Sequence, residues 1–371
     1  MRFRTRRAAI PVAAAITLTL VGGACSSKAN DTSTGSGSGG AAAGSTVPEG
    51  DFEALSGTIN GSGATFPAAF YEEAIDDLKD KAPKLTVNYG GGGSGKGKTE
   101  LADQVVDFAG SDSPIKDEDK AKYKGGAFLY VPTVAAPITV SFKLGGVDKL
   151  SLSPSTLAKI FQGEVKTWDD AAVKADNSGV TLPSTPIVIV HRSDGSGTTS
   201  NFTKYLRSAA GSDWKLDAGD TVNWPADSKA GNGNSGVATL ISQTEGSIGY
   251  VDYSDAKATK QQMAEIKNKD GKFVAPSLEG ASAALANAKV NDDLTYSALD
   301  TPGATSYPIT AGTYVIVYAK VTDKAKGEAI KGWLTYLLSD GQNLAASADF
   351  AKLPDEMRQK ATAQIDKITA G

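Results

Sequence analysis

The sequence is poor in the residues that carry most hydrolytic chemistry. Its 371 residues include one histidine, His191, and one cysteine, Cys25. A single cysteine excludes a disulfide bond within the chain, and a single imidazole argues against a binuclear His/Asp metal site of the phosphatase kind. A Ser-His-Asp triad would have to use His191, for which a packed or surface position is the favoured interpretation. We therefore expect no catalytic residue and no metal site.

Arginine is also scarce, and the charge balance is acidic. Four arginines lie in the first seven residues, and only Arg192, Arg207 and Arg358 follow them. The formal net charge is −4; without those four N-terminal arginines, 34 basic residues remain against 42 acidic ones. An acidic chain lacks the basic footprint that a general nucleic-acid binder needs, so we expect no nucleic-acid partner. A bound anion would have to be held by local geometry.

The first 50 residues indicate export. Residues 1–24 combine a basic start with an apolar stretch too short to span a bilayer comfortably, as in a secretory signal. The small residues before Cys25 resemble a bacterial lipobox, although Gly22 stands where leucine or valine is usual. The alternative is a simple secretory signal with an incidental thiol. Residues 25–50 are rich in Ser, Gly, Ala and Thr and predict a flexible linker. We therefore expect a lipid anchor at Cys25 on the outer face of the cell membrane.

From about residue 52 the sequence alternates short β-branched runs with helical patterns. Phe70, Ala74 and Leu78 recur at helical spacing, with Pro67 where a helix is expected to begin and Pro83 just after its end. Strands separated by helices predict an α/β architecture with mostly parallel sheets. The expected strands are residues 84–89, 128–142, 186–190, 247–251 and 314–319. The expected helices are residues 66–81, 99–105, 198–211 and 326–338.

Three loops rich in glycine, serine and threonine each lead into an expected helix, at residues 60–67, 89–99 and 192–202. A helix N-terminus presents unpaired N–H groups and a partial charge of roughly +0.5. Glycine lets the backbone approach a ligand, and hydroxyl groups add hydrogen-bond donors. One such loop alone predicts no more than a helix cap. Three of them, with the rare Arg192 in one, favour an oxyanion site.

The second loop contains a misleading motif. Residues 92–99, GGSGKGKT, match the G-x-x-x-x-G-K-T pattern of nucleotide hydrolases. Export removes the protein from the ATP pool, and 41 glycines make chance matches common, so nucleotide hydrolysis is disfavoured. Lys96 and Lys98 are expected to be solvated, although either could add positive potential near an anion. On pattern alone, Asp112 in the turn SDSP is an N-cap or turn aspartate.

Five segments, taken together and in this order, closely resemble the phosphate-binding proteins of the phosphate-specific ABC importer: GSGATFPA, VNYGGGGSGKG, VDFAGSDSPI, DGSGTTSNFTKYL and GSIGYVDY. The motifs FQGEVKTWDD and LPDEM add to a match that covers roughly residues 55–360. The resemblance implies a periplasmic-binding-protein-like fold, with two α/β lobes joined by a hinge and the ligand in the cleft. Lobe I would comprise residues 52–140 and 312–371, and lobe II residues 141–311.

The resemblance also implies the residues of a phosphate site. Arg192 matches the family's single cationic contact, Asp194 the acid that pairs with it, and Asp112 the aspartate that accepts a hydrogen bond. The remaining matches are the first-loop residues Ala64, Thr65 and Phe66, the second-loop residue Ser94, and the third-loop residues Ser196, Gly197 and Thr198. Two departures are visible: His191 stands where a second arginine is often found, and the second loop is unusually basic.

The function implied by the resemblance is high-affinity binding of inorganic phosphate outside the cell membrane, by a monomer without a cofactor. The partners would be the transmembrane permease subunits of an ABC importer, with their cytoplasmic ATPase subunits. At neutral pH phosphate carries a proton that Asp112 can accept, whereas sulfate carries none and would face a buried carboxylate. Two alternatives stay open: an exported phosphate-ester hydrolase, and a surface adhesin that binds no small anion.

Overall fold

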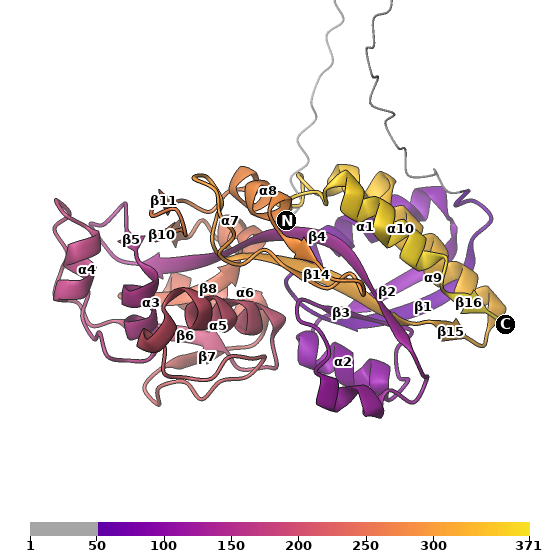
Figure 1. Ribbon diagram of the computed structural model, residues 1–371, viewed down its shortest axis with the longest axis horizontal. Coiled ribbons are helices and arrows are strands. Elements are labelled where there is room, and N and C mark those ends of the chain that lie inside the picture. Colours follow the sequence, from indigo (N-terminus) through magenta and orange to yellow (C-terminus); the bar gives the residue numbers. More distant parts are fainter. Residues whose placement is uncertain (1–50) are drawn as a thin grey trace, which may run out of the picture. The chain divides into compact units, whose positions relative to one another are not determined.

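The computed structural model describes residues 51–371. The predicted signal segment at residues 1–24, Cys25 and the linker at residues 25–50 lie outside the described residues. Within residues 51–371 the chain forms two α/β lobes joined by crossing strands, as Figure 1 shows. The predicted fold class is therefore confirmed.

A nine-stranded mixed sheet runs through both lobes. β1 is parallel to its neighbours β2 and β3, and β6 is parallel to β7 and β8. β14 and β4 pair antiparallel with each other and with their outer neighbours. The expectation of mostly parallel sheets is wrong for this centre, because two long strands cross there between the lobes. In spatial order the strands are β2 (Lys84–Gly90), β1 (Ser56–Gly63), β3 (Phe108–Ser111), β14 (Thr310–Tyr318), β4 (Phe128–Lys143), β8 (Ser247–Asp252), β6 (Val188–Arg192) and β7 (Lys229–Gly231), with β9 (Gln262–Met263) also beside β4.

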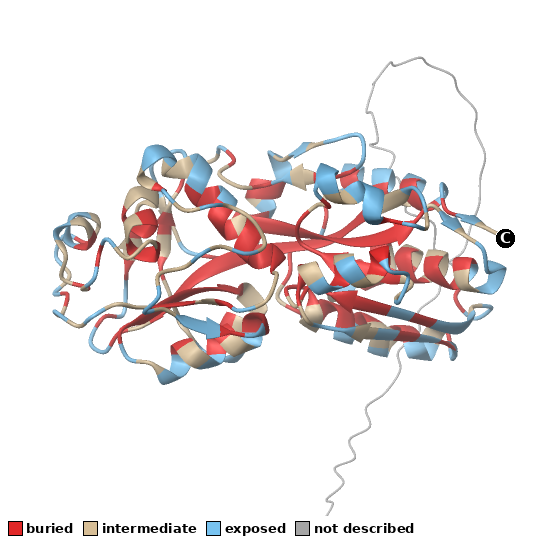
Figure 2. Ribbon diagram, turned by 90° about the horizontal axis from the view of Figure 1, so that it is seen from below, coloured by how far each residue is buried: buried red, intermediate tan, exposed pale blue. Residues whose placement is uncertain are grey.

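The strand β4 belongs to both lobes. Its residues up to Pro137 pair with β14, and its residues from Ile138 onward pair with β8. Most of β4 and all of β14 are buried, and Figure 2 shows them as a continuous red band. The exchange of partners supports a lobe boundary near residue 140. The boundaries at 140 and 312 stay a proposal.

Helices pack against the strands of each lobe. In Figure 1, α1, α9 and α10 lie on one side of β1–β3, and α2 lies on the other. In lobe II, α5 and α6 pack against β8, and α3 packs against α5. The helices are α1 (Ala68–Lys81), α2 (Ser94–Ala102), α3 (Pro154–Phe161), α4 (Ala171–Asp176), α5 (Gly197–Ala209), α6 (Gly233–Gln243), α7 (Tyr253–Ala258), α8 (Leu278–Ala286), α9 (Lys324–Leu338) and α10 (Asp355–Ile365).

Short strands form three smaller sheets at the edges of the described part. They are β11 (Phe273–Val274), β10 (Glu265–Lys267) and β5 (Ser151–Leu152); β12 (Lys289–Val290) and β13 (Tyr296–Ser297); and β15 (Lys320–Val321) and β16 (Thr369–Ala370). Across residues 51–371, no helix has both the length and the apolar character that a membrane crossing requires.

Two elements beside the predicted loops differ from their expected bounds. Helix α2 begins at Ser94 rather than residue 99, because Gly93 adopts a left-handed backbone (φ 90°) that turns the chain directly from the loop into the helix. Gly97 lets this helix lie close to β1, since a Cβ there would be 2.5 Å from the carbonyl oxygen of Ser62. Strand β6 extends to Arg192 rather than ending at residue 190. The basic residues of the second loop are therefore helical, and Arg192 is fixed by a sheet.

Candidate anion-binding site

The predicted loops follow the carboxyl ends of parallel strands, which share one edge within each lobe. In lobe I the loop after β1 is tied to its neighbours by two backbone hydrogen bonds. Gly93 N–H donates to the Gly63 carbonyl at 2.8 Å, and Ala64 N–H donates to the Gly110 carbonyl at 2.9 Å. Backbone hydrogen bonds at the ends of neighbouring strands thus hold the three lobe I segments of the predicted site together.

Ser94 joins the first lobe to the second. Its Oγ accepts hydrogen bonds from the Asp112 N–H at 3.2 Å and from the Gly197 N–H, in the other lobe, at 3.1 Å. A further cross-lobe bond runs from Gly95 N–H to the Gly195 carbonyl at 2.9 Å. A Cβ at Gly197 would lie 2.5 Å from Ser94 Oγ, so this approach requires glycine. The lobes therefore meet at the N-termini of α2 and α5, in a closed arrangement.

Arg192 and Asp194 form a buried pair. The side chain of Arg192 is 1% exposed and that of Asp194 is 10% exposed. Arg192 Nε donates to Asp194 Oδ1 at 2.8 Å, and Nη2 donates to Oδ2. Burial acts to raise the pKa of Asp194, but the hydrogen bonds from Arg192 and from the Gly233 N–H hold it below its ordinary value. The carboxylate fixes the guanidinium and leaves the Nη1 donors for another acceptor.

Asp112 is a buried carboxyl with one unsatisfied oxygen. The residue is 3% exposed, and its Oδ1 has no hydrogen-bond partner among residues 51–371. Burial raises the pKa of Asp112 to about 7, although Thr313 and the charge of Arg192 act to lower it. A carboxyl in this state can accept a hydrogen bond from a protonated ligand, or carry the proton itself, near neutral pH.

The remaining predicted residues divide by what their side chains do. Phe66 is fully buried and packs edge-on against Phe350, with ring centroids 5.8 Å apart, so only its backbone is free to contact a ligand. Ser196 caps α5, its Oγ accepting from the Thr199 N–H at 3.1 Å, and this leaves its O–H free to donate. The Ala64 carbonyl accepts from the Tyr89 hydroxyl at 2.7 Å. These residues thus support the site, and the Phe66 backbone and the Ser196 hydroxyl are also free to contact a ligand.

Asn234 also belongs to the site. This fully buried residue donates from its backbone N–H and from Nδ2 to Thr65 Oγ1, both at 3.2 Å, and from Nδ2 to Thr198 Oγ1 at 3.2 Å. It therefore connects the first loop of lobe I with the third loop in lobe II. Sequence reasoning missed it. The available signal was the segment GNGNSG at residues 231–236, a fourth glycine-rich loop that follows β7 and begins α6.

Comparison with known proteins places the chain in a family. A model of the PBP superfamily domain matches residues 36–341. The phosphate-binding protein PstS of Pasteurella multocida is 36% identical over 311 residues, which cover 83% of this chain and 89% of that protein. The phosphate-binding protein PstS 2 of Mycobacterium tuberculosis is 33% identical over 383 residues and 100% of both chains. The chain belongs to the PstS family of phosphate-binding proteins. Its fold is similar to that of a high-affinity periplasmic phosphate-binding protein solved with phosphate (PfluDING), with a TM-score of 0.70, 23% identity, and coverage of 83% of this chain and 93% of that one.

In this member of the PstS family, His191 lies beside the candidate anion site but does not face it. Its Nδ1 is 2.8 Å from the Arg192 carbonyl oxygen, and its ring stacks on Trp224 with centroids 5.3 Å apart. Burial lowers the pKa of His191, which favours the neutral imidazole. Within residues 51–371, no hydrogen bond joins His191 to a serine or an aspartate side chain. The contacts are those of a packed histidine.

The lysines of the second loop differ from expectation. Lys96 pairs with Glu100 on the same helix at 2.9 Å and is 45% exposed. The side chain of Lys98 is only 14% exposed and pairs with Asp220 of the other lobe at 2.6 Å, so the prediction that it is solvated is wrong. Lys98 is also the fifth residue of α2, whereas a nucleotide-binding loop presents its lysine from the start of the helix. This placement argues further against nucleotide hydrolysis.

Proposed function

We propose that this protein binds inorganic phosphate outside the cell membrane and delivers it to the permease of a phosphate ABC importer. The observation that carries the proposal is that one buried site contains both the Arg192 guanidinium and the Asp112 carboxyl. Arg192 attracts an oxyanion, and Asp112 favours an oxyanion that brings a proton. Inorganic phosphate satisfies both conditions at neutral pH, because it keeps at least one proton.

Neutral donors would complete the contacts with the anion. Helices α2 and α5 begin at the site, and each N-terminus contributes a partial charge of roughly +0.5. The hydroxyl groups of Ser196 and Thr198 are buried there, and Thr65 lies within hydrogen-bond reach of Asn234. The hydroxyl of Ser94 is also buried at the site, where it donates to Asp112 Oδ2 at 3.4 Å. Asp194 uses two nitrogens of Arg192, so the guanidinium would hold phosphate through its remaining donors. The backbone N–H group of Phe66 lies on the first of these loops, whereas those of Ala64 and Gly197 already donate to the Gly110 carbonyl and to Ser94 Oγ.

Asp112 would exclude sulfate. Sulfate carries no proton at neutral pH, so its oxygens would face the lone pairs of a buried carboxylate. A buried polar group left unpaired costs about 1–3 kcal/mol, and more when it is charged. The unsatisfied Oδ1 of Asp112 is the atom to which phosphate would donate its proton in a hydrogen bond. Discrimination would therefore come from repulsion of the wrong anion as well as from attraction of the right one.

Delivery to the permease would follow from closure of the lobes. Groups from both lobes meet at the site, so the anion would favour the closed arrangement over an open one. We propose that the transmembrane permease subunits recognise this closed form and that the cytoplasmic ATPase subunits drive release. A lipid at Cys25 and the linker at residues 25–50 would hold a monomer at the outer face of the membrane. Binding would be the whole of its chemistry, without catalysis or a cofactor.

Calorimetric titration of the purified protein with phosphate and with sulfate tests the proposal. We expect tight binding of phosphate and no measurable competition by sulfate at pH 8. Comparable affinities for the two anions would refute the assigned role of Asp112. Small-angle scattering tests closure, because phosphate should make the open protein more compact.

Two further measurements separate the alternatives. A phosphate-ester hydrolase would release phosphate on repeated turnover, so incubation of the protein with a phosphate ester distinguishes it from a binding protein. An adhesin would keep its adhesion when Arg192 is changed to alanine, because adhesion would not depend on an anion. The proposal predicts no turnover, and loss of phosphate binding in Arg192→Ala.

A further inference from the structure

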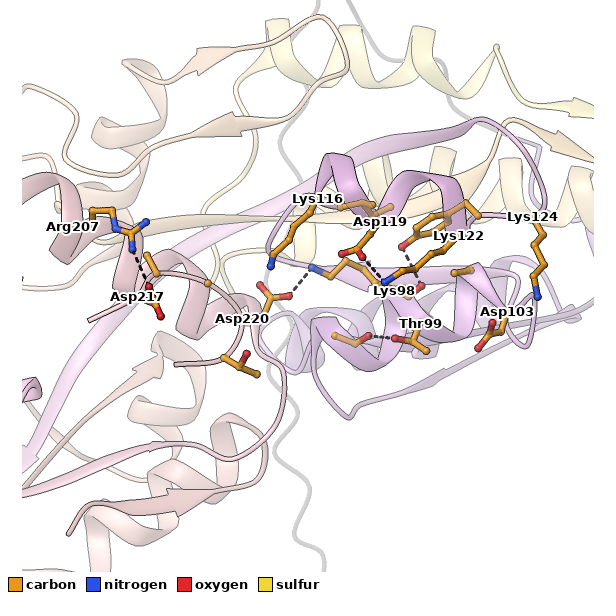
Figure 3. Close-up of a pocket in the computed structure, with 17 residues that line it drawn as sticks. Lys98, Thr99, Asp103, Lys116, Asp119, Lys122, Lys124, Arg207, Asp217 and Asp220 are labelled. Atoms are coloured by element: carbon orange, nitrogen blue, oxygen red, sulfur yellow. Dashed lines mark hydrogen bonds and ion pairs between the residues drawn. The ribbon is translucent and has the colours of Figure 1, made fainter. Parts of the chain in front are cut away.

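A second polar cluster, formed by Lys98, Ser113 and Asp220, joins the two lobes beside the anion site. Lys98 Nζ donates to Asp220 Oδ2 at 2.6 Å and to Ser113 Oγ at 3.0 Å, and Ser113 Oγ donates to Asp220 Oδ1 at 2.8 Å. Figure 3 shows Lys98 extending from α2 toward Asp220, which comes from the facing segment of the other lobe. The three groups satisfy one another, and none of them was predicted as a site residue.

Each member of this cluster is linked to a residue of the anion site, by a shared helix, by its position in the sequence or by a hydrogen bond. Lys98 lies on α2, which begins at Ser94, and Ser113 directly follows Asp112. The backbone carbonyl of Asp220 accepts a hydrogen bond from the Ser196 N–H at 2.9 Å. Ser196 is the residue that caps α5. The cluster therefore fixes the start of α5 in lobe II against α2 and the end of β3 in lobe I.

The environment of the cluster suits a contact that forms and breaks. The side chains of Lys98 and Asp220 are 14% and 20% exposed, so the pair is partly shielded and stronger than a surface pair. A groove of about 820 Å³, lined by both lobes, reaches the pair. Water in this groove can solvate the two charges when the lobes separate, which keeps opening possible.

A second ion pair between the lobes provides a contrast. Lys257 of α7 pairs with Asp349, and the Lys257 side chain is 47% exposed. Helix α7 directly follows β8, which pairs with β4 at the point where β4 passes between the lobes. A contact beside this crossing changes little when the lobes rotate about it. The Lys98–Asp220 pair lies at the anion site instead, where rotation separates the two groups.

We propose that Lys98, Ser113 and Asp220 form a latch that assembles on closure and slows the release of phosphate without touching it. This inference rests on the proposed function. Phosphate can leave only when the lobes open, so every contact that exists only in the closed state adds to the barrier for release. The latch also positions Ser196, because Asp220, the partner of Lys98, accepts a hydrogen bond from the Ser196 N–H through its backbone carbonyl. These are positioning residues, and the anion contacts remain those already described.

Stopped-flow measurement of phosphate association and release tests the latch, with Lys98→Met and Asp220→Asn as the main variants. Both keep the size of the side chain and remove its charge. We expect release to become roughly tenfold faster, the change that corresponds to about 1.4 kcal/mol. The preference for phosphate over sulfate should stay unchanged. Lys96→Met is the matched control, because it removes the same charge from the same helix but breaks a pair within lobe I. It should alter association as Lys98→Met does and leave release unchanged.

The charge-reversed double variant Lys98→Glu with Asp220→Lys supplies a rescue. It should restore much of the slow release that each of its single changes removes, which a general loss of stability would not produce. Equal release from Lys98→Met and the wild type would overturn the latch alone, provided that the wild type binds phosphate. A wild type that binds no phosphate would overturn both the latch and the proposed function.

Discussion

We expect the change Asp112→Asn to let the candidate site accept sulfate, the anion that we propose Asp112 excludes. Asparagine has almost the size of aspartate, so the packing around the residue is kept. Its Oδ1 can still accept the proton of phosphate in a hydrogen bond, and its Nδ2 can donate to an oxygen that carries no proton. We therefore expect a small effect on phosphate and a large one on sulfate.

The magnitude follows from the burial of Asp112. The residue is 3% exposed and its Oδ1 has no partner within residues 51–371. Bulk water therefore does not screen the repulsion between the carboxylate and sulfate. Removing an unpaired buried contact of this kind is worth about 1–3 kcal/mol. At 1.4 kcal/mol for each factor of ten, sulfate should bind about ten- to a hundredfold more tightly to the variant. The affinity for phosphate should change by less than about tenfold.

Calorimetric titration at pH 8 and at pH 5.5 measures this effect and its cause. Burial raises the pKa of Asp112 to about 7, so the wild type carries the charge at pH 8 and mostly the neutral acid at pH 5.5. Sulfate binding by the wild type should therefore strengthen as the pH falls through 7, because the protonated carboxyl can donate a hydrogen bond. Asp112→Asn should show no such dependence. Asp340→Asn, which removes a charge from lobe I outside the site, is the control. Sulfate binding that stays negligible in Asp112→Asn at both pH values would refute the reasoning.

Three further predictions concern the same site. Arg192→Lys keeps the charge but loses the forked pair with Asp194, so phosphate affinity measured by calorimetry should fall about ten- to a hundredfold; unchanged affinity would remove the guanidinium from the mechanism. Gly197→Ala places a Cβ 2.5 Å from Ser94 Oγ, which should prevent full closure and weaken phosphate binding by about tenfold or more. Small-angle scattering of the free protein should change little, because Gly197 approaches Ser94 only in the closed form. Because the pKa of Asp112 is raised in the folded state, the stability that it contributes is complete below the ordinary pKa of aspartate and is lost as the pH rises through 7. Between pH 5 and pH 8, the free energy of unfolding of the anion-free wild type, measured with urea, should therefore fall by about 2 kcal/mol more than that of Asp112→Asn. Parallel pH profiles of the two proteins would contradict this prediction.

Much of the fold could be predicted from local pattern, because its long elements are strongly periodic. The spacing of Phe70, Ala74 and Leu78 indicates α1, and all three residues are buried. Strands β1 and β3 were missed, because SGTINGSG and FAGS contain as much glycine and serine as a loop. Their strand character comes from pairing with β2 and β14, which no local pattern contains. The same limit explains the early start of α2 in a segment that reads as a glycine-rich turn.

The residues of the candidate site were expected from a resemblance, and the structure brings them together through contacts that no single motif contains. Thr65 and Thr198 meet through Asn234, whose loop carries the same glycine-rich signal as the other three. Lys98 could not be assigned from sequence at all. Its helix position is local, but its partner Asp220 lies 122 residues away in the other lobe.

The strand β4 has a consequence for how this protein can be divided or melted. Its backbone hydrogen bonds are shared between β14 on one side of Pro137 and β8 beyond Ile138, so each lobe contains part of a strand that the other lobe completes. A lobe expressed alone would carry a bare strand edge, of the kind that recruits other chains into aggregates. Because neither lobe is complete without the other, neither should unfold first on heating. The described part should therefore melt as a single cooperative unit in calorimetry.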